Sequence, residues 1–236
     1  MKHNKPCLII AALFSFFTVT GCLTTKKIDT FISSQYNDQV PQINTKKKTT
    51  NVLVKSPLVS NEATVSTTTS DTKMLPLLVY WNINHRFICT LNSQIAVANF
   101  SKAVNTMMNK GLNETIKGGQ LELTVNQAPA TFSMVDKTNI VWLLLYAVHW
   151  SKVYVEPDKK DLVVSYNLHL ADSTVKSGSI TIKNKEHDKN LRFFQSWKSA
   201  TSEYITTYDQ DVTAMTKEFV NKLMEELKQP AAVALQ

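Results

Sequence analysis

The chain has 236 residues, of which 43% are apolar and 19% charged, with a formal net charge of +7. This composition excludes a collagen, a fully disordered chain and a polytopic membrane protein, and it suffices for one packed domain with appendages. Of the five glycines, only Gly118 and Gly119 are adjacent. The sequence therefore lacks the glycine-rich loop with which nucleotide-binding folds hold phosphate.

The first 22 residues have the regions of a secretory signal peptide. Lys2 and Lys5 form a positive n-region, and residues 8–19 form an apolar run that ends shortly before Cys22. The run has about a dozen residues, whereas a membrane-spanning helix needs roughly 20. We therefore expect residues 1–21 to be removed rather than to remain as a transmembrane anchor.

Residues 19–22 read Val-Thr-Gly-Cys, which resembles the lipobox of bacterial lipoproteins, with Val19 where leucine is more common. In that family the cysteine receives a diacylglycerol, the chain is cut just before it, and the new amine is acylated. The resemblance implies cleavage after Gly21 and lipidation of Cys22, with an ordinary signal peptidase site as the alternative. Leu23 stands where an aspartate would retain such a protein at the inner membrane. The resemblance thus implies the outer membrane, on its periplasmic side.

Cys89 is the one cysteine left when Cys7 departs with the signal peptide and Cys22 is acylated. The mature chain can then form no intramolecular disulfide. Cys89 lies in an apolar, strand-like run, which favours a small buried hydrophobic residue over a nucleophile.

Positive charge is concentrated near the start of the mature chain. Residues 23–55 hold six lysines against two aspartates, and the whole chain has only two arginines, Arg86 and Arg192. A nucleic-acid-binding surface would spread such charge over the folded domain, so we expect no nucleic acid partner. Residues 46–48, three consecutive lysines, fit either contact with anionic lipid head groups or a solvated linker.

Composition divides the mature chain into a tether and a domain. Residues 22–72 are polar and basic, and we expect a lipidated tether in which residues 28–36 and 51–55 could form short elements. Residues 73–229 carry sustained apolar patterns and are predicted to form the globular domain. Residues 230–236 are predicted to be a C-terminal tail.

Two helices are predicted within the domain. Asn92 offers an N-cap, and apolar residues then recur at helical spacing up to a glycine stop at Gly111. Near the C-terminus, Asp209 or Asp211 can cap a second helix that ends before Pro230.

Strands are predicted between and before these helices. Residues 191–208 fit either a helix or a strand. The predicted strands are residues 77–80 and 87–91, separated by a turn or bulge, then 120–125, 130–135, 153–155, 161–170 and 175–183.

This order of elements predicts an α+β domain of two layers, with a mainly antiparallel sheet and two or three helices packed on one face. The layout, though no motif, resembles small envelope auxiliary lipoproteins of lipid or lipopolysaccharide transport. No residue roles follow from that resemblance.

The most apolar run of the mature chain is residues 140–150, too short to span a membrane. A buried core helix or central strand is the favoured interpretation. A membrane or lipid contact is the second, because Trp142, Tyr146 and Trp150 would share one helical face and such side chains favour interfaces. A site for a protein partner is the third.

No catalytic motif is present. The histidines lack metal-binding spacing, although His149 and His169 could converge in space. The acidic pairs Asp209 with Asp211 and Glu156 with Asp158 fit helix caps or solvated residues better than an acid and a base. We therefore expect no catalytic residue, no metal site and no cofactor, and rank an envelope hydrolase lowest.

These patterns favour a non-enzymatic outer-membrane lipoprotein that faces the periplasm as an accessory or assembly subunit of an envelope protein complex. Its expected attachment is to membrane lipid through acylated Cys22, and its expected contact is the run at residues 140–150. The alternatives are a surface-displayed binding or adhesion lipoprotein and a lipid-binding envelope protein.

Overall fold

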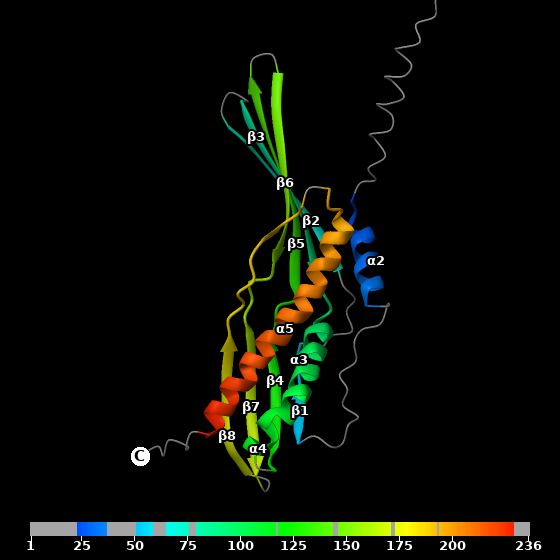
Figure 1. Ribbon diagram of the computed structural model, residues 1–236. Coiled ribbons are helices and arrows are strands. Elements are labelled where there is room, and N and C mark those ends of the chain that lie inside the picture. Colours follow the sequence, from blue (N-terminus) through cyan, green and yellow to red (C-terminus); the bar gives the residue numbers. More distant parts are fainter. Residues whose placement is uncertain are drawn as a thin grey trace, which may run out of the picture.

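The structure is a computed structural model (Figure 1) that describes residues 23–36, 51–58, 65–75, 79–116, 118–143, 146–170, 173–192 and 194–228. The predicted signal peptide, the lipidation site Cys22, the lysines at 46–48 and the C-terminal tail lie outside these residues.

The described strands form two sheets. The four-stranded sheet has the order β1-β4-β7-β8, and the five-stranded sheet has the order β2-β3-β5-β6-β9. Every pairing is antiparallel except that of β1 with β4. The bounds are β1 Val52–Lys55, β2 Val65–Met74, β3 Tyr80–Thr90, β4 Gln120–Gln127, β5 Thr131–Leu143, β6 Tyr146–Pro157, β7 Leu162–Leu170, β8 Ser173–Ile182 and β9 Lys189–Asn190.

Within the described residues, four α-helices accompany the sheets: α2 (Thr25–Gln35), α3 (Ser93–Met107), α4 (Asn113–Ile116) and α5 (Trp197–Lys228). A π-helical turn, Met108–Leu112, joins α3 to α4. In Figure 1, α5 runs along the body of the molecule with α3 beside it. The predicted cap of α3 is confirmed, because the Asn92 side chain accepts a hydrogen bond from the Gln94 backbone N–H at 2.8 Å.

Alternating apolar residues build the core. Leu121, Leu123 and Val125 on β4 are fully buried, as the period of two predicts for a strand with one covered face. From α5, Phe219 meets Phe100 of α3 with ring centroids 5.6 Å apart, and Tyr204 meets Phe132 of β5 at 4.5 Å. One continuous core therefore joins α3 and α5 to strands of both sheets.

The predicted α+β class with mainly antiparallel strands is confirmed. The prediction of one sheet is wrong, because the strands divide into two. Neighbouring strands in the sequence, such as β3 and β4, enter different sheets, and local patterns do not encode that choice of partner.

Three predicted boundaries are wrong. Residues 80–90 form one continuous strand, because Asn82 and Asn84 lie in the ladder and not in a turn. The helical segment does not end at Gly111. Gly111 has a φ of +106° and lies in the π-helical turn, which continues the chain into α4. Asp209 and Asp211 lie inside α5, which begins at Trp197, so neither is a cap.

Segments predicted in the tether belong to the folded body. The α2 helix buries Ile28 and Ile32 in the core, and Leu23 packs against the same core. The β1 strand pairs with β4 from Val52 to Lys55, and β2 pairs along its length with β3. The α2 and β2 segments look polar because α2 buries only Ile28 and Ile32, and β2 only Ser66.

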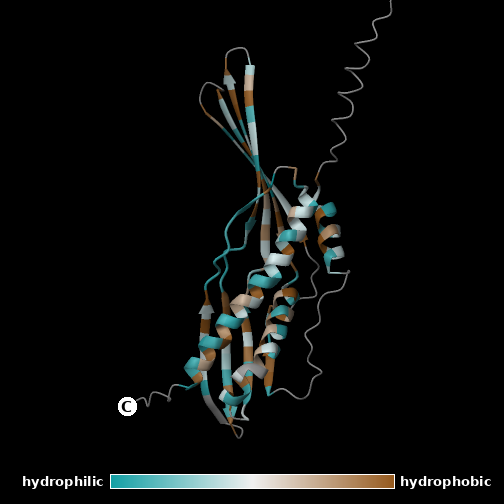
Figure 2. Cartoon of the chain, in the orientation of Figure 1, coloured by the Kyte–Doolittle hydropathy of each residue, from teal (hydrophilic) through white to brown (hydrophobic). Residues whose placement is uncertain are grey.

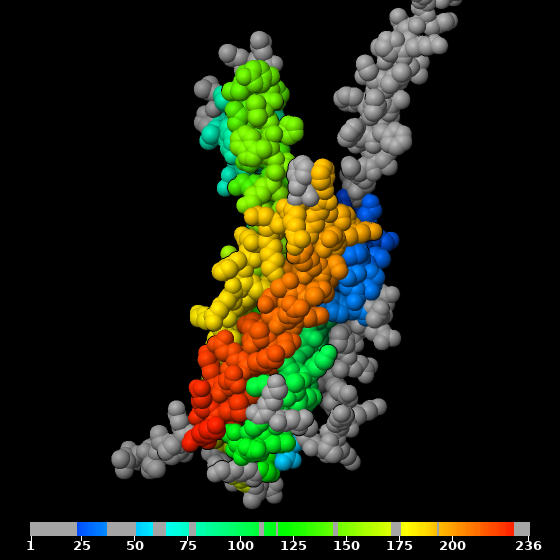
Figure 3. Space-filling model, in the orientation of Figure 1, coloured from blue at the N-terminus to red at the C-terminus, as the bar shows by residue number. Residues whose placement is uncertain are grey.

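The outer half of the five-stranded sheet projects from the body as a narrow extension (Figures 1 and 3). We call this part, residues 70–75, 79–85, 136–143 and 146–153, the blade. Its rows are aligned across all four strands, and one such row is Thr72, Ile83, Thr138 and Ser151. The blade ends near Leu143 and Tyr146, the last residue of β5 and the first of β6.

Candidate functional site

The apolar run at residues 140–150 forms the end of the blade. It contains the last residues of β5 and the first of β6, which pair as Leu143 with Tyr146. Trp142 is 45%, Tyr146 63% and Trp150 49% exposed. The favoured interpretation of a buried core segment is therefore wrong, and the run is an exposed strand pair.

The predicted helical face is also wrong. Paired residues share a face of a sheet, and successive residues alternate between faces. The pairing of Leu143 with Tyr146 and of Trp142 with Ala147 places Tyr146 and Trp150 on one face and Trp142 on the other. The three aromatic residues thus lie close together at the tip but point to opposite sides.

Apolar side chains cover both faces of the blade tip. Figure 2 shows hydrophobic segments along the outer part of the blade. The large exposed apolar residues there are Met74, Leu75, Val79, Trp142, Leu143, Tyr146, Val148 and Trp150. Exposed clusters of this kind mark contacts with proteins or membranes.

A polar network marks the lower boundary of the tip. The Tyr80 hydroxyl and the Asn82 amide both donate to Asn139 Oδ1 at 2.7 Å, and Asn84 donates to Asn82 Oδ1 at 2.9 Å. On the other face, Thr138 and Ser151 are hydrogen bonded at 2.8 Å. The blade therefore changes from apolar to polar over about one row of residues.

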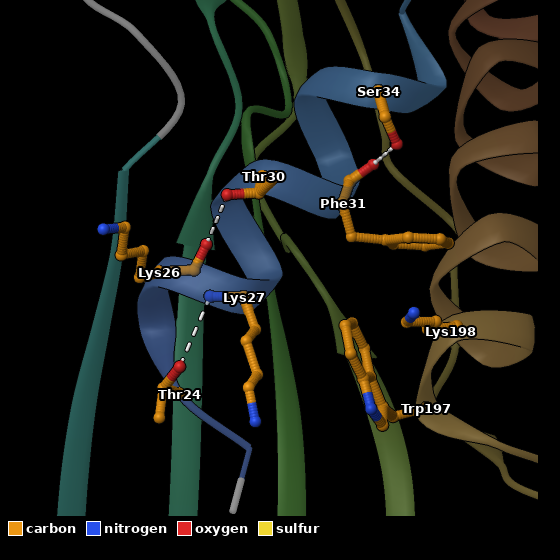
Figure 4. Close-up of a pocket in the computed structure, with 8 residues that line it drawn as sticks. All are labelled: Thr24, Lys26, Lys27, Thr30, Phe31, Ser34, Trp197 and Lys198. Atoms are coloured by element: carbon orange, nitrogen blue, oxygen red, sulfur yellow. Dashed lines mark hydrogen bonds between the residues drawn. The ribbon is translucent and has the colours of Figure 1, made fainter. Parts of the chain in front are cut away.

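A cavity of about 630 Å³ lies between α2, along much of its length, and the N-terminal end of α5 (Figure 4). The ring centroids of Phe31 and Trp197 are 5.4 Å apart, and the Lys198 ammonium lies within 6 Å of both rings. The residues that line it are Thr24, Lys26, Lys27, Thr30, Phe31, Ser34, Trp197 and Lys198. They include three lysines and no carboxylate, so the cavity is cationic and aromatic.

A second cleft, of about 520 Å³, holds a pair of carboxyl groups. Burial, followed by hydrogen bonding to Asp211, raises the pKa of Glu186 to about 8. Glu186 therefore stays largely protonated at neutral pH. Asp211 is a candidate from the sequence, whereas Glu186 lies in a loop and has no recognisable sequence signal.

We expect Glu186→Gln to stabilise the protein at alkaline pH. The pKa of Glu186 is raised on folding, so its favourable contribution is complete below about pH 4.5 and is lost as the pH rises to about 8. The glutamine stays neutral at all pH values. At pH 8 the variant should therefore have a free energy of unfolding higher than that of the wild type by on the order of 1 kcal/mol, after allowance for solvent screening. Urea unfolding at pH 5 and pH 8 measures this, with the exposed Glu225→Gln as control. If the free energy of unfolding depended on pH equally in the wild type and in Glu186→Gln, the prediction would be contradicted.

The other acidic residues considered from the sequence, Asp209, Glu156 and Asp158, have structural partners. Asp209 accepts a hydrogen bond from Asn99, and Glu156 forms an ion pair with Arg86 at 2.9 Å. Asp158 accepts from the backbone N–H groups of Ala130 and Thr131. Their predicted cap or solvated roles are thus replaced by specific contacts that hold elements together.

The structure separates the other candidate residues. His149 lies on the blade, whereas His169 pairs with Gln120 in the other sheet, so they do not converge. Cys89 is fully buried, which confirms the prediction for it, and burial raises the pKa of its thiol to about 11. A thiol of this kind is a poor nucleophile.

Among the described residues, no group of three or more histidine, cysteine or acidic side chains is arranged to hold a metal ion. No helix within the described ranges is both long and apolar enough to cross a membrane. Comparison of the chain with protein-family models, with curated proteins and with solved structures finds no match.

Proposed function

We propose that the chain is a lipid-anchored, non-enzymatic envelope protein of bacteria, which acts as an accessory subunit by holding its blade tip against an apolar, membrane-embedded surface. The observation that carries this proposal is the cluster of eight large apolar side chains exposed on the tip. The proposed location is the periplasmic side of the outer membrane.

The form of the tip favours a membrane-embedded surface over a soluble partner. A soluble partner normally covers one face of a sheet, whereas here both faces are apolar. Tryptophan and tyrosine are also the residues that favour the boundary between lipid and water. Five of them, Tyr80, Trp81, Trp142, Tyr146 and Trp150, lie in the outermost rows of the blade.

The proposed anchor lies at the end of the body from which the blade projects. Phe31 packs on Trp197, and farther along both helices Ser202 donates to Gln35, so α2 and α5 run in the same direction. Along α5, Trp197 lies on the blade side of Tyr204, which packs on Phe132 at the base of β5. The N-terminal end of α2, next to Leu23 and Cys22, therefore points toward the blade (Figure 1).

The cationic, aromatic cavity lies at this same end. Thr24, which lines it, is two residues from the proposed lipidation site. Lysines near a membrane gain about 1 kcal/mol each from anionic lipid, and aromatic rings favour its interface. An acylated Cys22, this cavity and the blade tip would thus all face one membrane.

Photo-crosslinking in native envelopes tests the proposal. With benzoylphenylalanine at Tyr146, we expect the full-length protein to form adducts with lipid or with an integral membrane protein. The same group at Glu225, exposed on the body, should form none of these. Adducts only with soluble proteins, or equal yields at both positions, would refute the proposed contact. Protease treatment of whole cells separates this location from surface display, in which the blade would be digested.

The substitution Trp142→Asp should abolish that contact without unfolding the protein. Trp142 is 45% exposed, so a carboxylate there remains solvated in the free protein but must be desolvated in an apolar contact. We expect the Tyr146 adduct to fall at least tenfold while the circular dichroism spectrum is unchanged. Asn221→Asp, which adds the same single charge at an exposed position of α5, is the matched control. An undiminished adduct would show that the tip is not the contact.

A further inference from the structure

Two strand edges of the blade are open. Among the described residues, β2 pairs only with β3, and β6 pairs beyond β5 only near its base, where Tyr154 and Val155 meet β9. The register of the blade pairings runs without a shift from Ser70 to Met74 and from Tyr146 to Val153. Long straight edges of this kind are templates for another strand, because their N–H and C=O groups lack partners in the sheet.

The directions of β2 and β6 allow the two edges to pair with each other. Strands alternate in direction in the order β2-β3-β5-β6, so β2 runs toward the tip and β6 runs away from it. The β2 edge of one molecule and the β6 edge of another would therefore meet in antiparallel orientation. Two β2 edges could pair antiparallel only with one of the two blades upside down, or in parallel with one blade turned over so that its faces are exchanged.

The outward backbone groups of the two edges fall in the same rows. The Leu75 N–H donates to the Tyr80 carbonyl on β3, so the backbone of Leu75 points into the sheet. Because alternate residues of an antiparallel strand point to opposite sides, the backbone N–H and C=O groups of Ser70, Thr72 and Met74 point outward. On β6, the Val153 carbonyl points outward to Leu191, so the groups of Ser151 and His149 point outward as well. Thr72 and Ser151 share one row, and Met74 and His149 share another.

Charge is complementary in the same register. Asp71 on β2 and Lys152 on β6 occupy one row of the blade, and both are exposed. With two blades side by side and level, Asp71 of one would lie opposite Lys152 of the next. A cross-strand pair of opposite charge adds roughly 0.2–1 kcal/mol to strand pairing.

The apolar tip gives a reason for pairing, and this step rests on the proposed function. Open strand edges are not tolerated in hydrocarbon, because each unpaired backbone group costs several kcal/mol there. A tip that contacts a membrane-embedded surface is stable only where its edges are covered. A neighbouring blade covers them and at the same time extends the apolar surface.

We propose that copies of this chain associate head to tail, with the β2 edge of one blade paired antiparallel with the β6 edge of the next. The contact is heterologous, since different edges meet. Such contacts continue from copy to copy until a ring closes or a filament forms. The assembled blades present one continuous apolar rim to the membrane.

Disulfide crosslinking of the full-length lipidated protein in its envelopes tests the pairing. Within one molecule, Thr72 and Ser151 are three strand spacings apart, about 14 Å, which exceeds the roughly 7 Å limit for a disulfide. Thr72→Cys with Ser151→Cys can therefore be joined only between molecules. We expect a ladder of covalent multimers on mild oxidation. If neighbouring blades are shifted by two residues along the strands, the ladder should instead appear with Ser70→Cys or Met74→Cys, each combined with Ser151→Cys.

Matched variants define the controls. Lys73→Cys with Ser151→Cys places the sulfurs on opposite faces of the blade and should give no ladder. His149→Pro, added to Thr72→Cys with Ser151→Cys, removes one outward N–H without removing a bond to β5 and should reduce the ladder at least fivefold. Thr72→Cys alone reports on pairing between two β2 edges.

The outcomes separate this proposal from the proposed function. Monomers for all three cysteine pairs, or dimers of Thr72→Cys alone, would overturn head-to-tail pairing, whereas the Tyr146 adduct with membrane components would still support the contact. A ladder without any such adduct would support the pairing and refute the membrane-embedded contact.

Discussion

Replacement of Cys22 by alanine should abolish acyl labelling and reduce recovery in the membrane fraction at least tenfold. Each buried methylene contributes about 0.8 kcal/mol, so loss of two or three acyl chains removes an essentially permanent attachment. Metabolic labelling with a fatty acid and fractionation of the envelopes measure both effects. Cys7→Ala is the matched control, because Cys7 lies in the segment predicted to be removed. An acylated, membrane-bound Cys22→Ala protein would refute the lipobox interpretation.

The position of α2 gives this anchor a structural consequence. The sequence predicts a tether of about 50 residues between Cys22 and the domain. In the structure, Leu23 already packs against the core, and α2 begins at Thr25. A lipid on Cys22 would therefore hold the body close to the membrane by the end from which the blade projects, so that the blade tip points to the same membrane.

Elements with strong local signals are predicted well. The α3 helix follows from the Asn92 cap and helical spacing, and β4 follows from the alternation of Leu121, Leu123 and Val125. The pairing of strands into two sheets is not predictable in this way, because it depends on contacts between residues far apart in the sequence. The same limit explains why α2, with only Ile28 and Ile32 buried, was assigned to a polar tether.

The candidate site was located in the sequence but assigned the wrong environment. An apolar run such as residues 140–150 is usually buried, since exposed apolar surface is costly in water. Here the β5–β6 pair extends beyond the helices, so no described helix covers Trp142 or Tyr146, and the two side chains stay 45% and 63% exposed. The segment around Asn82 also looks like a turn in sequence, although Asn82 is buried in a strand and donates a hydrogen bond to the buried Asn139.

The core and the blade should respond differently to the loss of an aromatic ring. Phe219 on α5 is fully buried and packs on Phe100, so Phe219→Ala should lower the free energy of unfolding by about 3–5 kcal/mol. Trp142 contacts Trp81, with ring centroids 5.8 Å apart, but is 45% exposed. Trp142→Ala should lower the free energy of unfolding by only about 1 kcal/mol, which is the contribution of an exposed aromatic pair.

Urea unfolding followed by circular dichroism measures both values, in a chain that begins at residue 22 and carries Cys22→Ala so that lipid does not interfere. Equal large losses would place Trp142 in the cooperative core and remove the basis for a free apolar tip. A small loss for Trp142→Ala beside a large one for Phe219→Ala would mean that the tip contributes little to folding. Selection for the fold alone would then not account for the apolar residues exposed there, and a contact outside the chain would.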